Sequence, residues 1–274
     1  MDRGINAVKK SKGYAKVRFI EEKTLRGGDF AEVKIFQADT RQRQRSPSPV
    51  RRKISPEKIA AMNEKNAKRH FIALVNQNFG EGDYHACCTY SGEPPPLETA
   101  QKIAAEFLRR LKKIYTAAGV DFRYIQIHEY GGKNERVHHH ILLPKGIPRE
   151  VIEDEWRRGL IWRRLGASPG ACNCDRLVPN RDEGLQAIAL YLTKRPANRK
   201  KWSGSRNLRP PEEITNDTRY GFSAFRKLIR AIREERGAQA IERIYRGWRC
   251  VEVRREENPI TRLEEISVKL TRTG

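Results

Sequence analysis

Hydrophobic residues interleave with charged ones in two short stretches near the N-terminus, residues 14–20 and 30–36. A period of two gathers the hydrophobic side chains on one face of a strand. Gly27 and Gly28 separate the two stretches, and consecutive glycines favour a tight turn. The N-terminal part is therefore predicted to contain a β-hairpin.

From residue 55 to residue 194, helix-like and strand-like spacings of hydrophobic residues alternate. Helices are predicted at 55–76, 97–118, 148–157 and 183–194. Strands are predicted at 84–90, 122–130, 137–144 and 172–178. Such an order packs naturally as a central antiparallel sheet with helices on it, an α+β fold of ferredoxin-like type. Residues 220–248 predict a long basic amphipathic helix or a helix pair.

Four parts of the chain follow from this pattern. We expect a strand-containing segment over 1–40, a flexible basic linker over 41–54, a main domain over 55–215 and a basic helical C-terminal region over 216–274. The linker prediction rests on residues 41–53, which hold six basic residues, two prolines and no acid. Such a stretch has almost nothing to bury that would offset the entropy of ordering.

Charge changes the picture from fold to partner. Lysine and arginine number 56 against 34 acids, which gives a net charge of +22. This balance favours a nucleic-acid partner, because basic side chains replace the counterions condensed on phosphates. A structural basic protein would show the same balance.

The sequence gives no sign of a membrane or secreted protein. No apolar run approaches the ~20 residues of a spanning helix, and the basic N-terminus lacks an apolar signal core. The five cysteines are odd in number, and none of their spacings fits a disulfide framework. We therefore expect a cytoplasmic protein with reduced thiols.

Four of the six histidines lie between positions 128 and 140. His138 and His140 stand two apart in a predicted strand, so they share a face about 7 Å apart, while His139 points to the other side. Two imidazoles at this separation can bind one divalent ion.

The neighbouring strand supplies the third candidate ligand. If Tyr130 pairs with Val137, Glu129 lies opposite His138 on the same face. A carboxylate with two imidazoles suits catalytic Mg²⁺ or Mn²⁺. A bulge of one residue would bring His128 or Gln126 there instead.

Tyr191 and Lys194 form a YxxK pattern in a predicted helix, where positions i and i+3 share one face. A tyrosine hydroxyl is a poor nucleophile at its free pKa of about 10, and a nearby cation would help it. Basic residues with one aromatic residue follow, and they are candidates for phosphate contact and base stacking. They are Arg195, Arg199, Lys200, Lys201, Trp202 and Arg206. Basic residues of the C-terminal helices are candidates for contact with duplex DNA near a nick.

Together these motifs resemble the HUH endonucleases, above all the rolling-circle replication initiators of bacterial mobile elements and small single-stranded DNA phages. The stretch RVHHHILL over 136–143 resembles their metal motif, and YLTKRP over 191–196 their one-tyrosine nucleophile motif. The resemblance covers residues 66–210 best. The central position of the metal motif, usually hydrophobic or aromatic, is His139 here, which leaves open a frame in which His139 and His128 act instead.

The resemblance implies a function. A metal held by His138, His140 and Glu129 would orient one phosphate of a single-stranded or hairpin origin. Tyr191, with Lys194 beside it, would attack that phosphate to give a 5′-phosphotyrosine and a free 3′-hydroxyl that primes copying. Since the sequence has no P-loop, a host or element helicase would unwind the DNA and a polymerase would copy it.

Three alternatives stay open. A relaxase-like or transposase-like member of the same superfamily would use the same chemistry. A basic nucleic-acid-binding protein on a ferredoxin-like sheet would need neither a metal nor Tyr191. A structural zinc module would need thiolates near the histidines, and no cysteine spacing supports that arrangement.

Overall fold

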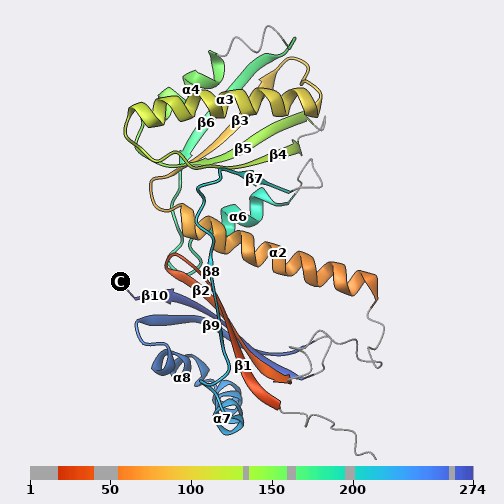
Figure 1. Ribbon diagram of the computed structural model, residues 1–274, viewed down its shortest axis with the longest axis vertical. Helices are drawn as coiled ribbons and strands as arrows, with labels where there is room; N and C mark the ends of the chain where they lie inside the picture. The colour runs from red at the N-terminus through yellow and green to blue at the C-terminus, as the bar shows by residue number, and fades with distance from the viewer. Residues whose placement is uncertain are drawn as a thin grey trace, which may run out of the picture.

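The computed structural model describes residues 18–39, 55–131, 136–158, 165–194, 201–258 and 263–273. These residues form two antiparallel five-stranded sheets and six helices (Figure 1). The strands are β1 (Arg18–Gly27), β2 (Phe30–Asp39), β3 (Tyr84–Ser91), β4 (Ile125–Gly131), β5 (Arg136–Leu143), β6 (Ser168–Arg176), β7 (Ser203–Gly204), β8 (Glu212–Asn216), β9 (Trp248–Glu257) and β10 (Glu264–Arg272). The helices are α2 (Pro56–Asn78), α3 (Leu97–Ala117), α4 (Arg149–Arg157), α6 (Gln186–Leu192), α7 (Phe222–Arg233) and α8 (Gly237–Ile244).

The sheet that carries the candidate motifs has the strand order β6-β3-β5-β4-β7, and we call it the motif sheet. Helices α3 and α4 cover one of its faces, where Phe107 and Trp156 are completely buried. Helix α6 and the second half of α2 pack on the other face, against Ile125, Ile127 and Leu142. This mixed architecture agrees with the predicted α+β class, and it has helices on both faces of the sheet.

The second sheet, which we call the flanking sheet, has the order β8-β1-β2-β10-β9. It joins the two ends of the chain, because β10 pairs with β2. Helices α7 and α8 cover one face, where Phe225 and Ile241 pack against Ile35 and Val268. The motif sheet is thus inserted between β2 and β8 of the flanking sheet.

The C-terminal region differs from the prediction of a region that is helical throughout. A helix pair spans only part of it, and β9 and β10 follow. Glu235 has a φ of 60° and separates α7 from α8. The predicted N-terminal hairpin is confirmed as β1 and β2, which pair from Gly27↔Phe30 outward. The linker over 41–54 lies outside the described residues.

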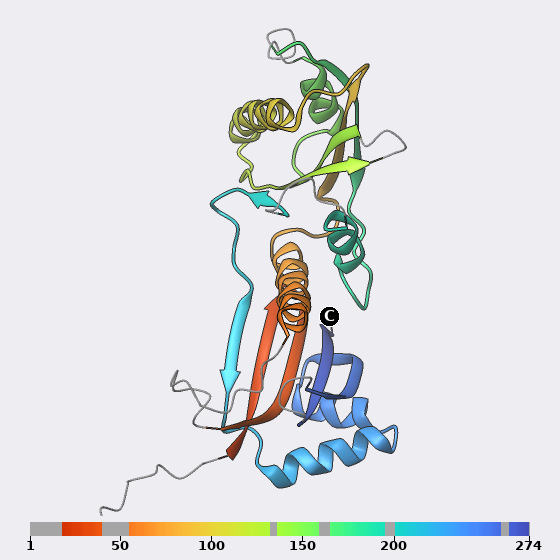
Figure 2. The same ribbon diagram turned by 90° about the vertical axis from the view of Figure 1, so that its right-hand side faces the viewer.

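Helix α2 lies between the two sheets (Figure 2). Ser55 caps it by accepting a hydrogen bond from the Lys58 amide at 3.4 Å, and proline occupies the first turn. On the flanking sheet, Gly27 permits close approach, because a Cβ there would collide with the Ala73 carbonyl. The helix thereby connects the strands of both sheets.

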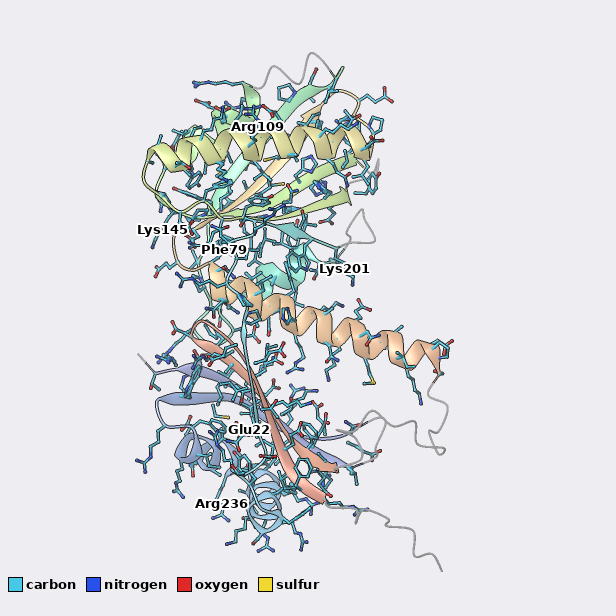
Figure 3. The ribbon with its side chains drawn as sticks, in the orientation of Figure 1. Glu22, Phe79, Arg109, Lys145, Lys201 and Arg236 are labelled. Atoms are coloured by element: carbon cyan, nitrogen blue, oxygen red, sulfur yellow. The ribbon has the colours of Figure 1, made fainter. Side chains whose placement is uncertain are left out.

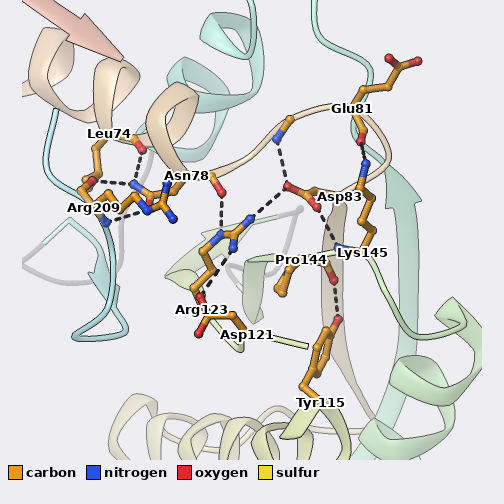
Figure 4. Close-up of polar contacts among 11 residues, drawn as sticks. Leu74, Asn78, Glu81, Asp83, Tyr115, Asp121, Arg123, Pro144, Lys145 and Arg209 are labelled. Carbon is orange, nitrogen blue, oxygen red and sulfur yellow. Dashed lines mark hydrogen bonds and ion pairs between the residues drawn. The ribbon is translucent and has the colours of Figure 1, made fainter. Parts of the chain in front are cut away.

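Asn78 at the end of α2 ties together the two chain segments that enter and leave the motif sheet (Figure 4). Its amide nitrogen donates to the carbonyls of Leu74 and Arg209, and its oxygen accepts from the Arg209 amide, each at 2.8 Å. Its own carbonyl accepts from Arg123 Nε at 2.7 Å. Buried Asp83 extends this junction by accepting from the amides of Gly80 and Lys145.

No helix in the described part of the chain is long and apolar enough to cross a membrane. The five cysteines carry free thiols; Cys88, Cys172 and Cys174 are buried.

Candidate metal centre and tyrosine

Three potential metal ligands converge on the α6 side of the motif sheet. Tyr130 pairs with Val137, and Glu129 therefore stands opposite His138, which confirms the expected strand register. One ligand atom from each of Glu129, His138 and His140 lies within 4.8 Å of the others. This buried group could hold a metal ion.

Both histidines of the group have one ring nitrogen occupied by the protein. His138 Nδ1 lies 3.2 Å from the Arg136 carbonyl, to which only a protonated nitrogen can donate. His140 Nδ1 lies 2.9 Å from Nε2 of His85, whose ring stacks on that of His140 at 5.1 Å between centroids. Metal-binding histidines commonly engage their second nitrogen in this way, which fixes the tautomer and the ring orientation. The arrangement leaves Nε2 of both rings for a ligand.

Two buried atoms of the group have no hydrogen-bond partner among the described residues: Glu129 Oε2 and His140 Nε2. They lie 3.4 Å apart. Burial, followed by the neighbouring imidazoles of His85 and His138, lowers the pKa of His140 to about 3. The ring is therefore neutral at pH 7, and the contact with Glu129 is not an ion pair. With the proton of His140 on Nδ1, a lone pair faces the carboxylate, and a cation between the two atoms would satisfy both.

The alternative frame with His128 and His139 is wrong for the observed register. The β4–β5 pairing has no bulge, and both side chains point to the α3 side. His139 is completely buried, its Nδ1 lies 2.7 Å from His128 Nδ1, and its Nε2 lies 2.6 Å from the Tyr90 hydroxyl. Since both ring nitrogens of His139 are engaged, this pair belongs to the core under the helices.

Tyr191 lies beside the candidate ligands. Helix α6 places its ring edge-on to His140, with 5.4 Å between centroids. The side chain is 52% exposed, so a large substrate can reach it. Burial of part of the ring raises the pKa of Tyr191, and the charges of Glu129 and Cys87 raise it further. Without a cation, the phenol is therefore protonated at neutral pH.

Helix α6 is shorter than predicted and ends at Leu192, so Lys194 lies beyond it. Asn180 explains the late start of the helix, since its side chain accepts from the amides of Asp182 and Glu183 and holds a turn. The Lys194 amide donates to the Tyr191 carbonyl at 3.2 Å, and the lysine side chain is exposed.

The candidate DNA-binding residues fall in different places. Arg195, Arg199 and Lys200 lie outside the described residues. Lys201, labelled in Figure 3, forms an ion pair of 3.3 Å with Glu64 of α2. Trp202 packs on Phe71 at 5.4 Å between ring centroids.

The sequence analysis missed the residues that surround the ligands from β3 and β6. His85 and Cys87 share the α6 side with His140, and Asp175 is the cross-strand partner of His85. Their spacing of two in the strand before the metal motif was the available signal. Gly131 was missed as well; a Cβ there would lie 2.6 Å from His138 Cε1, so glycine makes room for that ligand.

Residues 83–196 match a family model described as replication-associated protein, of the ORF2 type. The matched span is less than half of the chain, and it runs from the start of β3 to the residues just after α6. It contains Tyr191 and the Glu/His/His group, and it is consistent with a rolling-circle replication initiator. No curated protein and no solved structure gives a significant match.

Proposed function

We propose that this protein is an HUH-type endonuclease that nicks and rejoins one DNA strand to start rolling-circle replication. One observation carries the proposal: Tyr191 is exposed and packs against His140 of a buried Glu/His/His group. All of these residues lie within the span that matches a replication-associated family. Its substrate would be a single-stranded or hairpin origin, and a helicase and a polymerase of the host or element would be its partners.

The motif sheet also fits the ferredoxin-like HUH fold that we propose. The metal ligands come from β4 and β5, two adjacent antiparallel strands inside the sheet, which hold them at fixed separations. The nucleophile comes from a helix packed below those strands. A rigid sheet thus supplies the ligands, and an exposed helix face supplies Tyr191.

His138, His140 and Glu129 would hold the cation, Mg²⁺ or Mn²⁺. When bound, the cation would polarise the scissile phosphate and offset its charge. His85 would keep His140 in the tautomer that presents Nε2, with Asp175 next to it on the neighbouring strand.

The Tyr191 hydroxyl would attack the phosphorus in line with the bond to the 3′-oxygen. A bond forms between the Tyr191 oxygen and phosphorus, the bond between phosphorus and the 3′-oxygen breaks, and the phenol proton ends on the released 3′-hydroxyl. The linkage stays a phosphodiester, so the reverse attack by a 3′-hydroxyl rejoins the strand without ATP. Lys194 would stabilise the negative charge that develops on the tyrosine and phosphate oxygens.

A covalent-adduct assay tests this function. The protein is mixed with labelled hairpin oligonucleotides from its own locus and Mn²⁺, with and without EDTA, and run on a denaturing gel. We expect a shifted band that needs the metal and is lost in Tyr191→Phe. The matched control is Tyr130→Phe, which alters a second exposed tyrosine and should retain the band.

The ligands are tested by His138→Ala combined with His140→Ala, which should abolish nicking and Mn²⁺ binding. His70→Ala is the control, since that exposed histidine contacts Glu213 away from the site. An adduct that persists in Tyr191→Phe would exclude the proposed nucleophile. Normal Mn²⁺ binding in the double variant would exclude the proposed ligands.

A further inference from the structure

A groove of about 950 Å³ runs along α3 at the edge of the motif sheet. One wall is the side of α3 that bears Arg109 and Lys112. The opposite wall is the start of β4 with the loop that follows β7. Tyr124 and Gln126 line it from the strand, and Arg206 from the loop. Figure 3 marks Arg109 on α3. We call this depression the α3 groove.

The charge of the α3 groove favours a polyanion. Three cations line it against one acid, Asp121. That carboxylate is already neutralised in part, since it accepts from Asn207 at 2.9 Å and lies 3.7 Å from Arg123. Within the described residues, Lys112 and Arg206 form no salt bridge, so their charges are available to a ligand. Arg109 pairs with Glu106, which lies outside the groove.

The loop wall is fixed rather than loosely placed. The Ser205 hydroxyl accepts from the Tyr124 amide at 3.1 Å, and the Ser205 amide donates to the Tyr124 carbonyl at 3.0 Å. Asn207 also donates to the Phe122 carbonyl at 3.2 Å. These bonds on either side of Arg206 hold its position beside the strand and so favour a built site over a solvated loop.

The groove also offers contacts for a base. Tyr124 is only partly buried, and aromatic side chains stack unpaired bases with little regard to sequence. Gln126 adds an amide whose oxygen has no hydrogen-bond partner among the described residues. Nothing bonds this oxygen in place, so the amide can turn to meet a polar group of a ligand.

The position of the groove connects it with the candidate metal centre. Gln126 precedes Glu129 by three residues on β4, a distance of about 10 Å along a strand. Strand β7 pairs with β4 only at Ile125 and Gln126, and no described strand covers the outer edge of β4 beyond them. A polynucleotide can therefore pass from the metal face over this edge into the groove.

We propose that the α3 groove binds the single-stranded DNA next to the scissile phosphate. Lys112, Arg206 and Arg109 hold its phosphates, and Tyr124 stacks one of its bases. This inference rests on the proposed nicking function, because that function supplies the single strand and fixes where it begins.

Equilibrium binding of fluorescein-labelled oligo(dT) 15-mer to the full chain tests the groove. The measurement uses Tyr191→Phe protein in EDTA, so that neither covalent attachment nor metal contributes. Lys112→Ala with Arg206→Ala should weaken binding about tenfold or more and reduce the slope of log K against log salt by about 1.4, which is about 0.7 for each lost phosphate contact. The control, Lys113→Ala with Arg243→Ala, removes the same charge from exposed helix positions and should leave the slope within about 0.3 of the unaltered value.

Tyr124→Leu separates base stacking from charge. It should weaken oligo(dT) binding about fivefold or more and leave an abasic oligomer of equal length unaffected. Thermal melts of each variant exclude unfolding as the cause. Equal slope changes in the groove pair and the control pair would overturn the proposal, as would an equal loss of the abasic ligand in Tyr124→Leu.

The two proposals fail in different ways. If the wild type forms no covalent adduct while the groove pair still loses oligo(dT), the nicking function fails and the groove remains a DNA site. If adducts form and the groove pair binds as the control does, only the groove assignment fails.

Discussion

Glu129→Gln is the substitution that most sharply separates a metal centre from an ordinary buried ion pair. In the metal-free protein, Glu129 Oε2 and His140 Nε2 are buried without partners among the described residues, 3.4 Å apart. An unsatisfied buried polar atom costs about 1–3 kcal/mol. A glutamine amide at this position can donate to His140 Nε2 and removes the buried charge. We therefore expect Glu129→Gln to raise the metal-free stability by about 1–3 kcal/mol.

Metal should reverse the order of the two proteins. At a Mn²⁺ concentration about 100 times the Kd, binding stabilises the wild type by about 2.7 kcal/mol. For a chain of this size that is a rise in Tm of roughly 5–10 °C. Glu129→Gln loses the anionic ligand, and Mn²⁺ should leave its Tm nearly unchanged.

Thermal melts in EDTA and in Mn²⁺, followed by circular dichroism, measure both effects. Glu155→Gln is the matched control, because that carboxylate already accepts a hydrogen bond from Arg110 and its loss should lower the Tm under both conditions. The reasoning is refuted if Glu129→Gln melts below the wild type in EDTA and Mn²⁺ stabilises both proteins equally.

Further predictions concern the residues around this centre. His85→Ala should lower Mn²⁺ affinity about 10- to 100-fold in a calorimetric titration, because the orienting contact to His140 is lost; unchanged affinity would remove His85 from the site. Lys194→Ala should slow adduct formation without abolishing it, and an unchanged rate in a time course would exclude its role. Asn78→Ala should cost about 1–3 kcal/mol in urea unfolding, since its side chain makes three hydrogen bonds at the junction. Burial keeps His139 and His140 neutral, with the pKa of His139 well below 6.5 and that of His140 about 3. The unfolded state then binds more protons below about pH 6.5, so metal-free stability should fall as the pH drops toward about 5, by up to about 1.4 kcal/mol per histidine per pH unit; urea melts in EDTA with a flat profile would contradict this.

The metal-bearing hairpin could be predicted because its signals are local. Alternation places His138 and His140 on one face, and the pairing of Tyr130 with Val137 brings Glu129 to the same face. The tautomers could not be predicted, because they depend on His85 from another strand.

The second sheet escaped the sequence analysis because its pairing is non-local. Ile266, Val268 and Leu270 alternate with polar residues and are buried, which is an ordinary strand signal. They follow a strongly basic helical stretch, and the helical pattern was extended too far. No local pattern reveals that their partner is β2, more than 200 residues earlier in the sequence.

The region that matches the replication-associated family does not build its own core. Ile125, Ile127 and Leu142 lie on the ligand-bearing face of β4 and β5, and their packing partners include Phe71 and Val75 of α2, which precede residue 83. Each fully buried side chain of this kind contributes about 1.5–3 kcal/mol. Helix α2 in turn packs on the flanking sheet at Gly27. The geometry of the metal ligands therefore depends on elements outside the matched span, and the flanking sheet is part of the support of the site.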